Sequence, residues 1–255
     1  MKWIKFLLPV VFLFLLEGCL DIDEEIDVNK NGSGQWEMKL DMSQLVDIMQ
    51  AYMSKEDLEK QFPQKKMDTV MLMKDLVDTA KNITPDKKAL MRDGKVHLQV
   101  DMDQKVLKTD MKFPFKNLTD LQQLRLAVGN NSSGAGQLLK GFGGTNDSGD
   151  TSQGPDLGMF SSLYNFKITD GTISNKLNNQ KWEDIQKNPQ FAQIKEAGNT
   201  GIEVPYSLTI KLPRPVKKID NPIAKLSEDK KTITIKYNLM ETYQNPERFE
   251  YYIEY

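Results

Sequence analysis

Residues 22–42, IDEEIDVNKNGSGQWEMKLDM, carry the clearest structural pattern of the chain. Apolar and acidic residues alternate over residues 22–28, and residues 35–42 place four large apolar side chains on one face of an extended strand: Trp36, Met38, Leu40 and Met42. The connecting residues 29–34, NKNGSG, are rich in Asn and Gly, which favour tight turns. The stretch therefore predicts a β-hairpin with one face turned toward a core.

Helical spacing follows the hairpin directly. Ser43 is a candidate N-cap, and the next apolar residues recur at helical intervals: Leu45, Ile48, Met49, Tyr52 and Met53. We predict that this helix lies on the core through these residues. A second helix is predicted from about Met67 to Asn82, with Val70, Met71, Lys74 and Val77 along one stripe.

Further strands and helices are predicted along the rest of the chain, among them one or two short helices around Pro189, indicated by Trp182, Ile185, Phe191 and Ile194. Residues 96–102 and 106–115 form a second hairpin, residues 117–128 a short helix, and residues 160–169 and 172–177 a third hairpin. Residues 202–212 and 232–239 read as strands, and residues 249–255 as a buried closing strand. The prediction is an α+β fold, made of antiparallel β-hairpins with several helices packed on one face of the sheet.

The chain divides at a segment rich in Gly, Ser and Asn. Residues 129–158 contain nine of the sixteen glycines, which indicates a flexible loop or linker. We therefore expect a signal peptide at residues 1–18, a first α+β half at 19–128, and a strand-rich second half at 159–255 packed on the same sheet.

Composition excludes several functions. The formal net charge is −2, and acidic and basic residues are interspersed, so no basic patch is present that could follow a nucleic-acid backbone. The chain has a single cysteine, Cys19, so intramolecular disulfides are excluded. We expect no nucleic-acid partner.

The N-terminus carries an export signal. Lys2 and Lys5 precede an apolar run too short to span a bilayer, and Leu16-Glu17-Gly18-Cys19 follows it. This arrangement resembles the lipobox of bacterial lipoproteins, although Glu17 replaces the small residue usual before the glycine. The resemblance implies cleavage before Cys19, a lipid on its sulfur and a further acyl chain, such as palmitate, on its amino group. A plain secretory signal and an uncleaved anchor remain alternatives.

The acidic residues after Cys19 bear on location. The run Leu20-Asp21-Ile22-Asp23-Glu24-Glu25 resembles the surface-export signals of Bacteroidota lipoproteins, and it also reads as an edge strand. The first quarter of the mature chain resembles uncharacterised lipoproteins of that group. The resemblance implies lipid anchoring in the outer membrane, facing either the cell surface or the periplasm.

Candidates for catalysis and ligand binding are few. His97 is the only histidine, and no Gly-x-Ser-x-Gly motif accompanies it, so no catalytic residue is assigned. Asp27, Asn29 and Asn31 stand at alternate positions before Gly32, like the first half of a calcium loop, but Met38 occupies the position of the bidentate Glu. These three are weak calcium candidates, a plain turn is the preferred interpretation, and no cofactor is predicted.

The preferred hypothesis is a membrane-anchored envelope lipoprotein with a non-enzymatic binding, accessory or structural role. Its partners would be the membrane, through the lipid on Cys19, and an envelope protein or an extracellular ligand. One alternative is a carboxylate-dependent hydrolase of carbohydrate or peptide, which requires acids gathered in one concave pocket. A further alternative is a carrier of lipid or lipoprotein cargo, with an apolar groove built from Met-rich helices.

Overall fold

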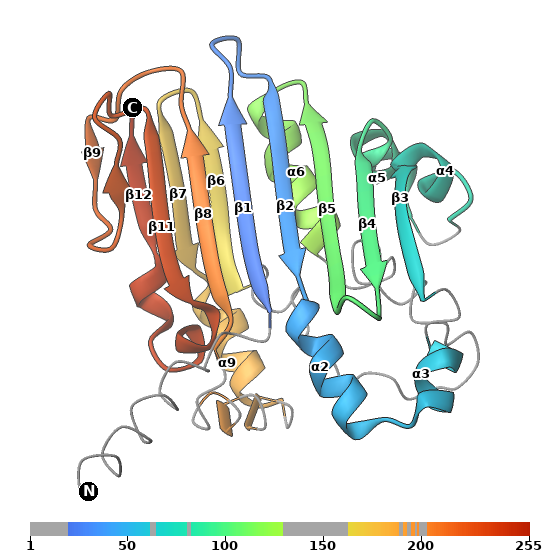
Figure 1. The fold of residues 1–255 in the computed structure, drawn as a ribbon. Helices are drawn as coiled ribbons and strands as arrows, with labels where there is room; N and C mark the ends of the chain where they lie inside the picture. The colour runs from blue at the N-terminus through green and yellow to red at the C-terminus, as the bar shows by residue number, and fades with distance from the viewer. Residues whose placement is uncertain are drawn as a thin grey trace, which may run out of the picture.

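The fold is α+β, as predicted (Figure 1). The computed structural model describes residues 20–61, 65–80, 83–129, 163–188, 191–192, 195–196, 198 and 203–255. Within these residues the strands form an eight-stranded and a four-stranded sheet. The predicted linker and the signal peptide lie outside the described residues, apart from Gly129, so the division of the chain stays a prediction.

The larger sheet has the strand order β10-β11-β8-β1-β2-β5-β4-β3. Its pairs are antiparallel except for β1 with β8, which run parallel. The bounds are β1 Asp21–Val28, β2 Gly34–Asp41, β3 Lys66–Leu72, β4 Lys95–Asp101, β5 Val106–Phe115, β8 Pro205–Lys211, β10 Lys225–Leu226 and β11 Thr232–Asn238.

The smaller sheet has the order β6-β7-β12-β9 and lies behind the β8–β11 end of the larger one (Figure 1). Its bounds are β6 Tyr164–Thr169, β7 Thr172–Leu177, β9 Lys218–Ile219 and β12 Tyr251–Glu254. Helix α6, Leu118–Gly129, covers the same face of the larger sheet behind β2 and β5. Residues of both sheets and of α6 form one buried core cluster. The strands alternate apolar side chains toward the space between the layers, and α6 turns one apolar side toward it, with Leu121 and Leu124 buried.

The predicted first hairpin is confirmed as β1 and β2, which pair from Asp21 opposite Asp41 to Val28 opposite Gly34. Trp36 and Leu40 are both 2% exposed, as their shared face predicts. The edge-strand interpretation is wrong, because β8 pairs with β1 on its other side. A pairing between residues 184 positions apart, such as Ile22 and Tyr206, leaves no local trace in the sequence of β1.

Helix α2, Ser43–Tyr52, confirms the predicted helix but not its buried face. Its N-cap residue is Met42, because the Ser43 hydroxyl instead accepts a hydrogen bond from the Leu107 N–H at 3.2 Å. Val46 is fully buried, whereas Leu45 and Tyr52 are 38% and 86% exposed. The core contacts α2 through Val46 and Met49. The buried side of the helix is therefore rotated from the predicted stripe, which did not include Val46.

The predicted helix over residues 67–82 is wrong in its first half. Residues 66–72 form β3, which pairs along its whole length with β4. Its side chains alternate, so Met67 and Met71 pack inward while Val70 is 60% exposed. Of the residues that the structure describes in this range, those of α4, Met73–Val77, are helical. Neighbouring β4 decides the outcome, because strand pairing satisfies the backbone groups that a helix would have satisfied internally.

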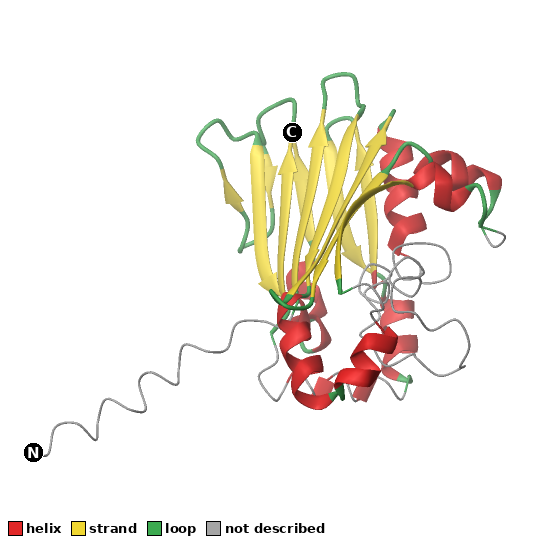
Figure 2. Cartoon of the chain, turned by 45° about the vertical axis from the view of Figure 1, so that its right-hand side comes forward, coloured by secondary structure: helices red, strands yellow, loops and turns green. Residues whose placement is uncertain are grey.

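Two short helices have no counterpart among the predicted elements: α3, Lys55–Gln61, and α5, Pro85–Met91. The second hairpin, the 117–128 helix and the third hairpin are confirmed as β4–β5, α6 and β6–β7. Among the elements whose bounds the structure gives, the other helical ones are α9 Asn179–Gln186, which lies before Pro189 where a short helix was expected, and the 3₁₀ helices η3 Leu239–Tyr243 and η4 Pro246–Phe249. Helices α2 and α3 lie beyond the ends of the strands, while α6 lies against the sheet (Figure 2).

The closing strand is confirmed. β12 lies between β7 and β9, and its inward residues are buried: Tyr251, Ile253 and Tyr255 are 4%, 0% and 2% exposed. Phe249, the first residue of the predicted strand, belongs to η4 and is also buried. The C-terminus is therefore fixed in the smaller sheet.

Candidate functional site

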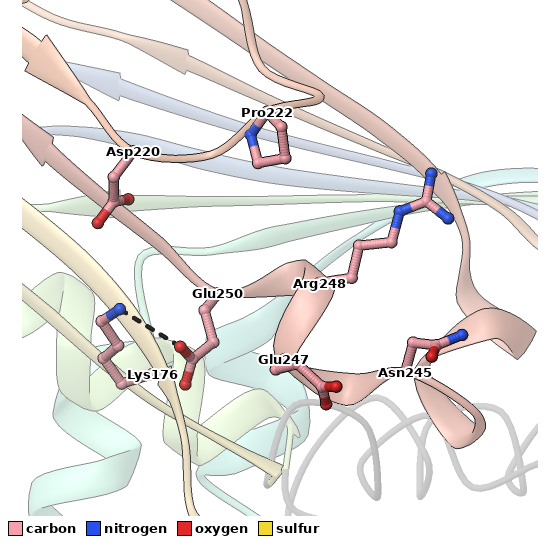
Figure 3. Close-up of a pocket in the computed structure, with 7 residues that line it drawn as sticks. All are labelled: Lys176, Asp220, Pro222, Asn245, Glu247, Arg248 and Glu250. Atoms are coloured by element: carbon pink, nitrogen blue, oxygen red, sulfur yellow. Dashed lines mark hydrogen bonds and ion pairs between the residues drawn. The ribbon is translucent and has the colours of Figure 1, made fainter.

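A polar cavity of about 520 Å³ opens beside the start of β12 (Figure 3). Segments distant in sequence line it: Lys176 from β7, residues 220–222 after β9, and residues 245–250 in and around η4. Its charged residues have both signs, namely Lys176, Asp220, Glu247, Arg248 and Glu250. The pairing of β7, β12 and β9 brings these segments together.

Hydrogen bonds to the backbone fix the rim of this cavity. Glu250 Oε1 accepts a hydrogen bond from the Leu177 N–H at 2.8 Å. Its other carboxylate oxygen, Oε2, forms an ion pair with Lys176 Nζ at 3.3 Å. Asp220 accepts from the Tyr252 N–H. Buried Asn221 donates to the Glu250 carbonyl at 2.8 Å. Two of the three acids therefore hold strand ends in place.

The cations of the cavity are paired but accessible. Lys176 and Arg248 side chains are each 51% exposed, and Arg248 forms an ion pair with Glu241 at 3.0 Å. Exposed ion pairs contribute only about 0–1 kcal/mol, so a charged ligand can replace either partner at low cost. The cavity can thus receive a polar ligand that carries charges of both signs.

A second cavity of about 270 Å³ lies under α2 and α3. Apolar and polar residues both line it: Gln50, Met53, Lys55, Leu58, Lys65, Met102 and Asp103. Gln50 Nε2 donates to the Met102 carbonyl at 2.7 Å and ties α2 to the turn between β4 and β5. The Met-rich segments expected to form a cargo groove instead pack on the second core cluster, with Val46, Leu98 and Val100.

A buried charge cluster joins the layers but borders neither cavity. Glu24, 2% exposed, accepts hydrogen bonds from Arg125 Nε at 2.7 Å, Arg125 Nη2 at 3.0 Å and Trp36 Nε1 at 2.8 Å, and another from the Tyr206 hydroxyl. The guanidinium also lies 4.0 Å from the centre of the Phe166 ring. Every group is satisfied inside the protein, so the cluster is a link between layers.

His97 lies on the outer face of the larger sheet, because its neighbours in β4, Val96 and Leu98, are buried on the opposite, core-facing side. His97 Nε2 is 2.6 Å from Asp68 Oδ1 on β3, and Asp110 of β5 is its cross-strand neighbour on the other side. Burial and nearby Glu37 raise the pKa of Asp110. Burial alone would also raise the pKa of Glu37, but hydrogen bonds from Lys39 and Lys112 lower it. A Ser or Cys nucleophile bonded to His97 is not found among the described residues.

The weak calcium candidates lie in or beside the β1–β2 turn. Asn29 Nδ2 donates to Ser33 Oγ at 3.2 Å, and Asn31 Oδ1 accepts from the Ser33 N–H at 3.1 Å and from Ser33 Oγ at 2.7 Å. Asp27 lies in β1 opposite Gln35. Gly32 has φ of +80°, the left-handed conformation that such turns need. The amide side chains thus support the turn itself. Among the described residues, no group of three or more His, Cys, Asp and Glu is placed to hold a metal ion.

Cys19 lies just outside the described residues, and Leu20 is the first that the structure describes. No helix in the described part of the chain has the length and hydropathy to cross a membrane. The charged residues of the 520 Å³ cavity were missed at the level of sequence. They are ordinary surface residue types spread over residues 176–250, and only strand pairing gathers them.

Comparison with known proteins finds a similar solved structure. No protein-family model and no curated protein sequence matches the chain. Among solved structures, the chain is similar to the NMR structure of the folded domain of Mycobacterium tuberculosis LppM, with 7% sequence identity and a TM-score of 0.34. The match covers 94% of this chain and 92% of that one. At this TM-score the likeness carries no argument about fold or function.

Proposed function

We propose that this chain is a lipid-anchored protein of the bacterial outer membrane with a non-enzymatic binding role. The lipobox-like residues 16–19 support the anchor. Cys19 would carry the lipid, and the domain would face the cell surface or the periplasm.

The observation that carries the binding role is the state of the acids in the 520 Å³ cavity. Glu250 and Asp220 accept hydrogen bonds from the backbone of β7 and β12, so they are structural residues. Acid–base catalysis needs a carboxyl group free to exchange a proton with the substrate. Exposed Lys176 and Arg248 suit the recognition of a charged ligand instead. The ligand class is a small polar molecule or peptide segment with charges of both signs.

Two measurements test this function. Mass spectrometry of the protein purified from membranes should find acyl groups on Cys19, and Cys19→Ser should release the protein into the soluble fraction. Protease digestion on intact and on lysed cells then separates surface from periplasm. A mature chain without acyl groups would refute the anchor.

Binding is tested by calorimetry with a library of charged di- and tripeptides. Arg248→Gln should weaken binding about tenfold, because a charge-assisted hydrogen bond contributes roughly 1.5–3 kcal/mol. Arg92→Gln is the matched control, since Arg92 is an exposed, ion-paired arginine (57%) whose partner, Asp78, is not in the cavity. Equal affinities for the two variants would refute the cavity as the site.

The hydrolase alternative keeps one observation in its favour, namely three acids around a single cavity. Glu247 would have to be its acid or base, because Glu250 and Asp220 are held by the backbone. Hydrolysis of glycan or peptide substrates that Glu247→Gln abolishes would establish it. Activity that survives this substitution would exclude a role for the cavity in catalysis.

A further inference from the structure

Helix α2 leaves the larger sheet beside the point where the chain enters it. Asp21 of β1 pairs with Asp41 of β2, and α2 begins two residues later at Ser43. The antiparallel register therefore places the start of β1 beside the residues that lead from β2 into α2. Figure 1 shows both α2 and the start of β1 at the same end of the sheet, opposite the β1–β2 turn.

One side of α2 is apolar and uncovered. Leu45 and Tyr52 are 38% and 86% exposed, and their spacing of seven residues, two helical turns, puts them on the same side. Val46 buries another side of the helix in the core. The only charged residue of α2 is Asp47, which is ion-paired with Lys105. The exposed side therefore has little charge to desolvate.

We propose that this side of α2 lies in the surface of the membrane that holds the protein, an inference that rests on the proposed lipid anchor at Cys19. An acylated Cys19 sits at the level of the lipid headgroups, and only Leu20 separates it from β1. A helix of ten residues is about 15 Å long, so all of α2 lies within about 20 Å of the anchor. Headgroup layers are roughly 5–8 Å thick, so a neighbouring helix meets them.

Residue types agree with this placement. Tyrosine is enriched at membrane–water interfaces, because its ring is apolar and its hydroxyl is polar. A helix in the interface buries its apolar side roughly 5–10 Å into the boundary between headgroups and acyl chains. With α2 in this position, the strands rise from the membrane and the β1–β2 turn points away from it (Figure 1).

Tryptophan quenching tests the contact. Cys19 is the only cysteine, so the chain without residues 1–18, which keeps every described residue, can be coupled through its thiol to a maleimide lipid. The vesicles contain phosphatidylethanolamine and phosphatidylglycerol with brominated acyl chains, which quench nearby tryptophan. Tyr52→Trp reports on α2, and Val70→Trp, at a position 60% exposed on β3, is the matched control. The parent chain supplies the background from Trp36 and Trp182.

We expect brominated vesicles to quench roughly a third to a half of the fluorescence added by Tyr52→Trp, given an interfacial depth of that order. Fluorescence added by Val70→Trp should not change. Equal signals from the two variants, quenched or unquenched, would overturn the inference. Chemical coupling replaces the acylation made in the cell, so an unacylated Cys19 in vivo would refute the proposed function without altering this result.

Discussion

Glu24 of β1 and Arg125 of α6 form a two-point ion pair inside the core, with Nε–Oε1 and Nη2–Oε2 distances of 2.7 and 3.0 Å. The residues are 101 positions apart, and Glu24 is 2% exposed. The pair joins the larger sheet to α6, and through the Phe166 ring it reaches the smaller sheet. Three components of the fold thus meet at one carboxylate.

Removing one partner of this pair should destabilise the protein strongly. Arg125→Met leaves a buried carboxylate without its charge partner, and we expect the free energy of unfolding to fall by about 3–5 kcal/mol. Urea unfolding of the variant and of the parent protein measures this loss of stability. The double variant Glu24→Leu with Arg125→Met removes both charges, so it should recover part of the loss. A double variant less stable than Arg125→Met would contradict this account.

Two acids on the outer face of the sheet should respond to pH with opposite signs. Burial and Glu37 raise the pKa of Asp110, so the folded chain holds this proton to a higher pH than the unfolded chain does. Ionised Asp110 therefore costs stability at neutral pH. Asp110→Asn should raise the urea midpoint at pH 7, and this gain should vanish as the pH falls below about 4.

The pKa of Asp41 is shifted in the opposite direction to that of Asp110. Burial alone would raise its pKa, but hydrogen bonds from Lys108 and Ser43 lower it. A lowered pKa contributes stability above the unfolded value near 3.8, which is lost as the pH falls through the folded value. Asp41→Asn should therefore lower the urea midpoint at pH 7 and matter less at pH 3. If both substitutions changed the urea midpoint at pH 7 in the same direction, the pKa shifts of these two acids would not be what governs stability.

The last residue of the chain should contribute as much as an interior one. Tyr255 is 2% exposed, and its hydroxyl donates to the Thr169 carbonyl at 2.9 Å. We expect Tyr255→Phe to cost about 1 kcal/mol and Tyr255→Ala about 3–5 kcal/mol in urea unfolding. Tyr52→Ala is the matched control on an 86% exposed tyrosine and should change stability by less than about 0.5 kcal/mol. A loss for Tyr255→Ala as small as the one expected for Tyr52→Ala would show that the end of the chain is peripheral to the fold.

Gly94 should not accept a side chain. A Cβ atom there would lie 2.4 Å from Cδ1 of the Phe113 ring and 3.0 Å from Met73 Cγ. Gly94→Ala should destabilise the protein by about 1–3 kcal/mol through overpacking. The midpoint of urea unfolding should fall at unchanged slope. Asp93→Ala, at the exposed neighbouring position, is the control. An equal loss of stability in this variant would show that the change disturbs the turn, and that the contact with Phe113 is not the cause.

Local patterns predicted much of the fold. The β1–β2 hairpin, β4–β5, α6 and β6–β7 follow from side-chain periodicity and turn residues that lie close together in the sequence. Residues 66–72 were mistaken for a helix, because four apolar residues among seven fit either period. Residues 45 and 52 of α2 were expected in the core, because periodicity defines a stripe but not the side on which a partner packs.

The α+β class, the strand patterns and the lipobox-like segment at residues 16–19 can be predicted from the amino-acid sequence, since each depends on neighbouring residues. Three relationships emerge only in the folded chain: β8 flanks β1, Arg125 contacts Glu24, and Lys176 and Arg248 line one cavity. Such long-range pairings arise when separate segments bury their apolar faces together, and no single segment encodes its partner.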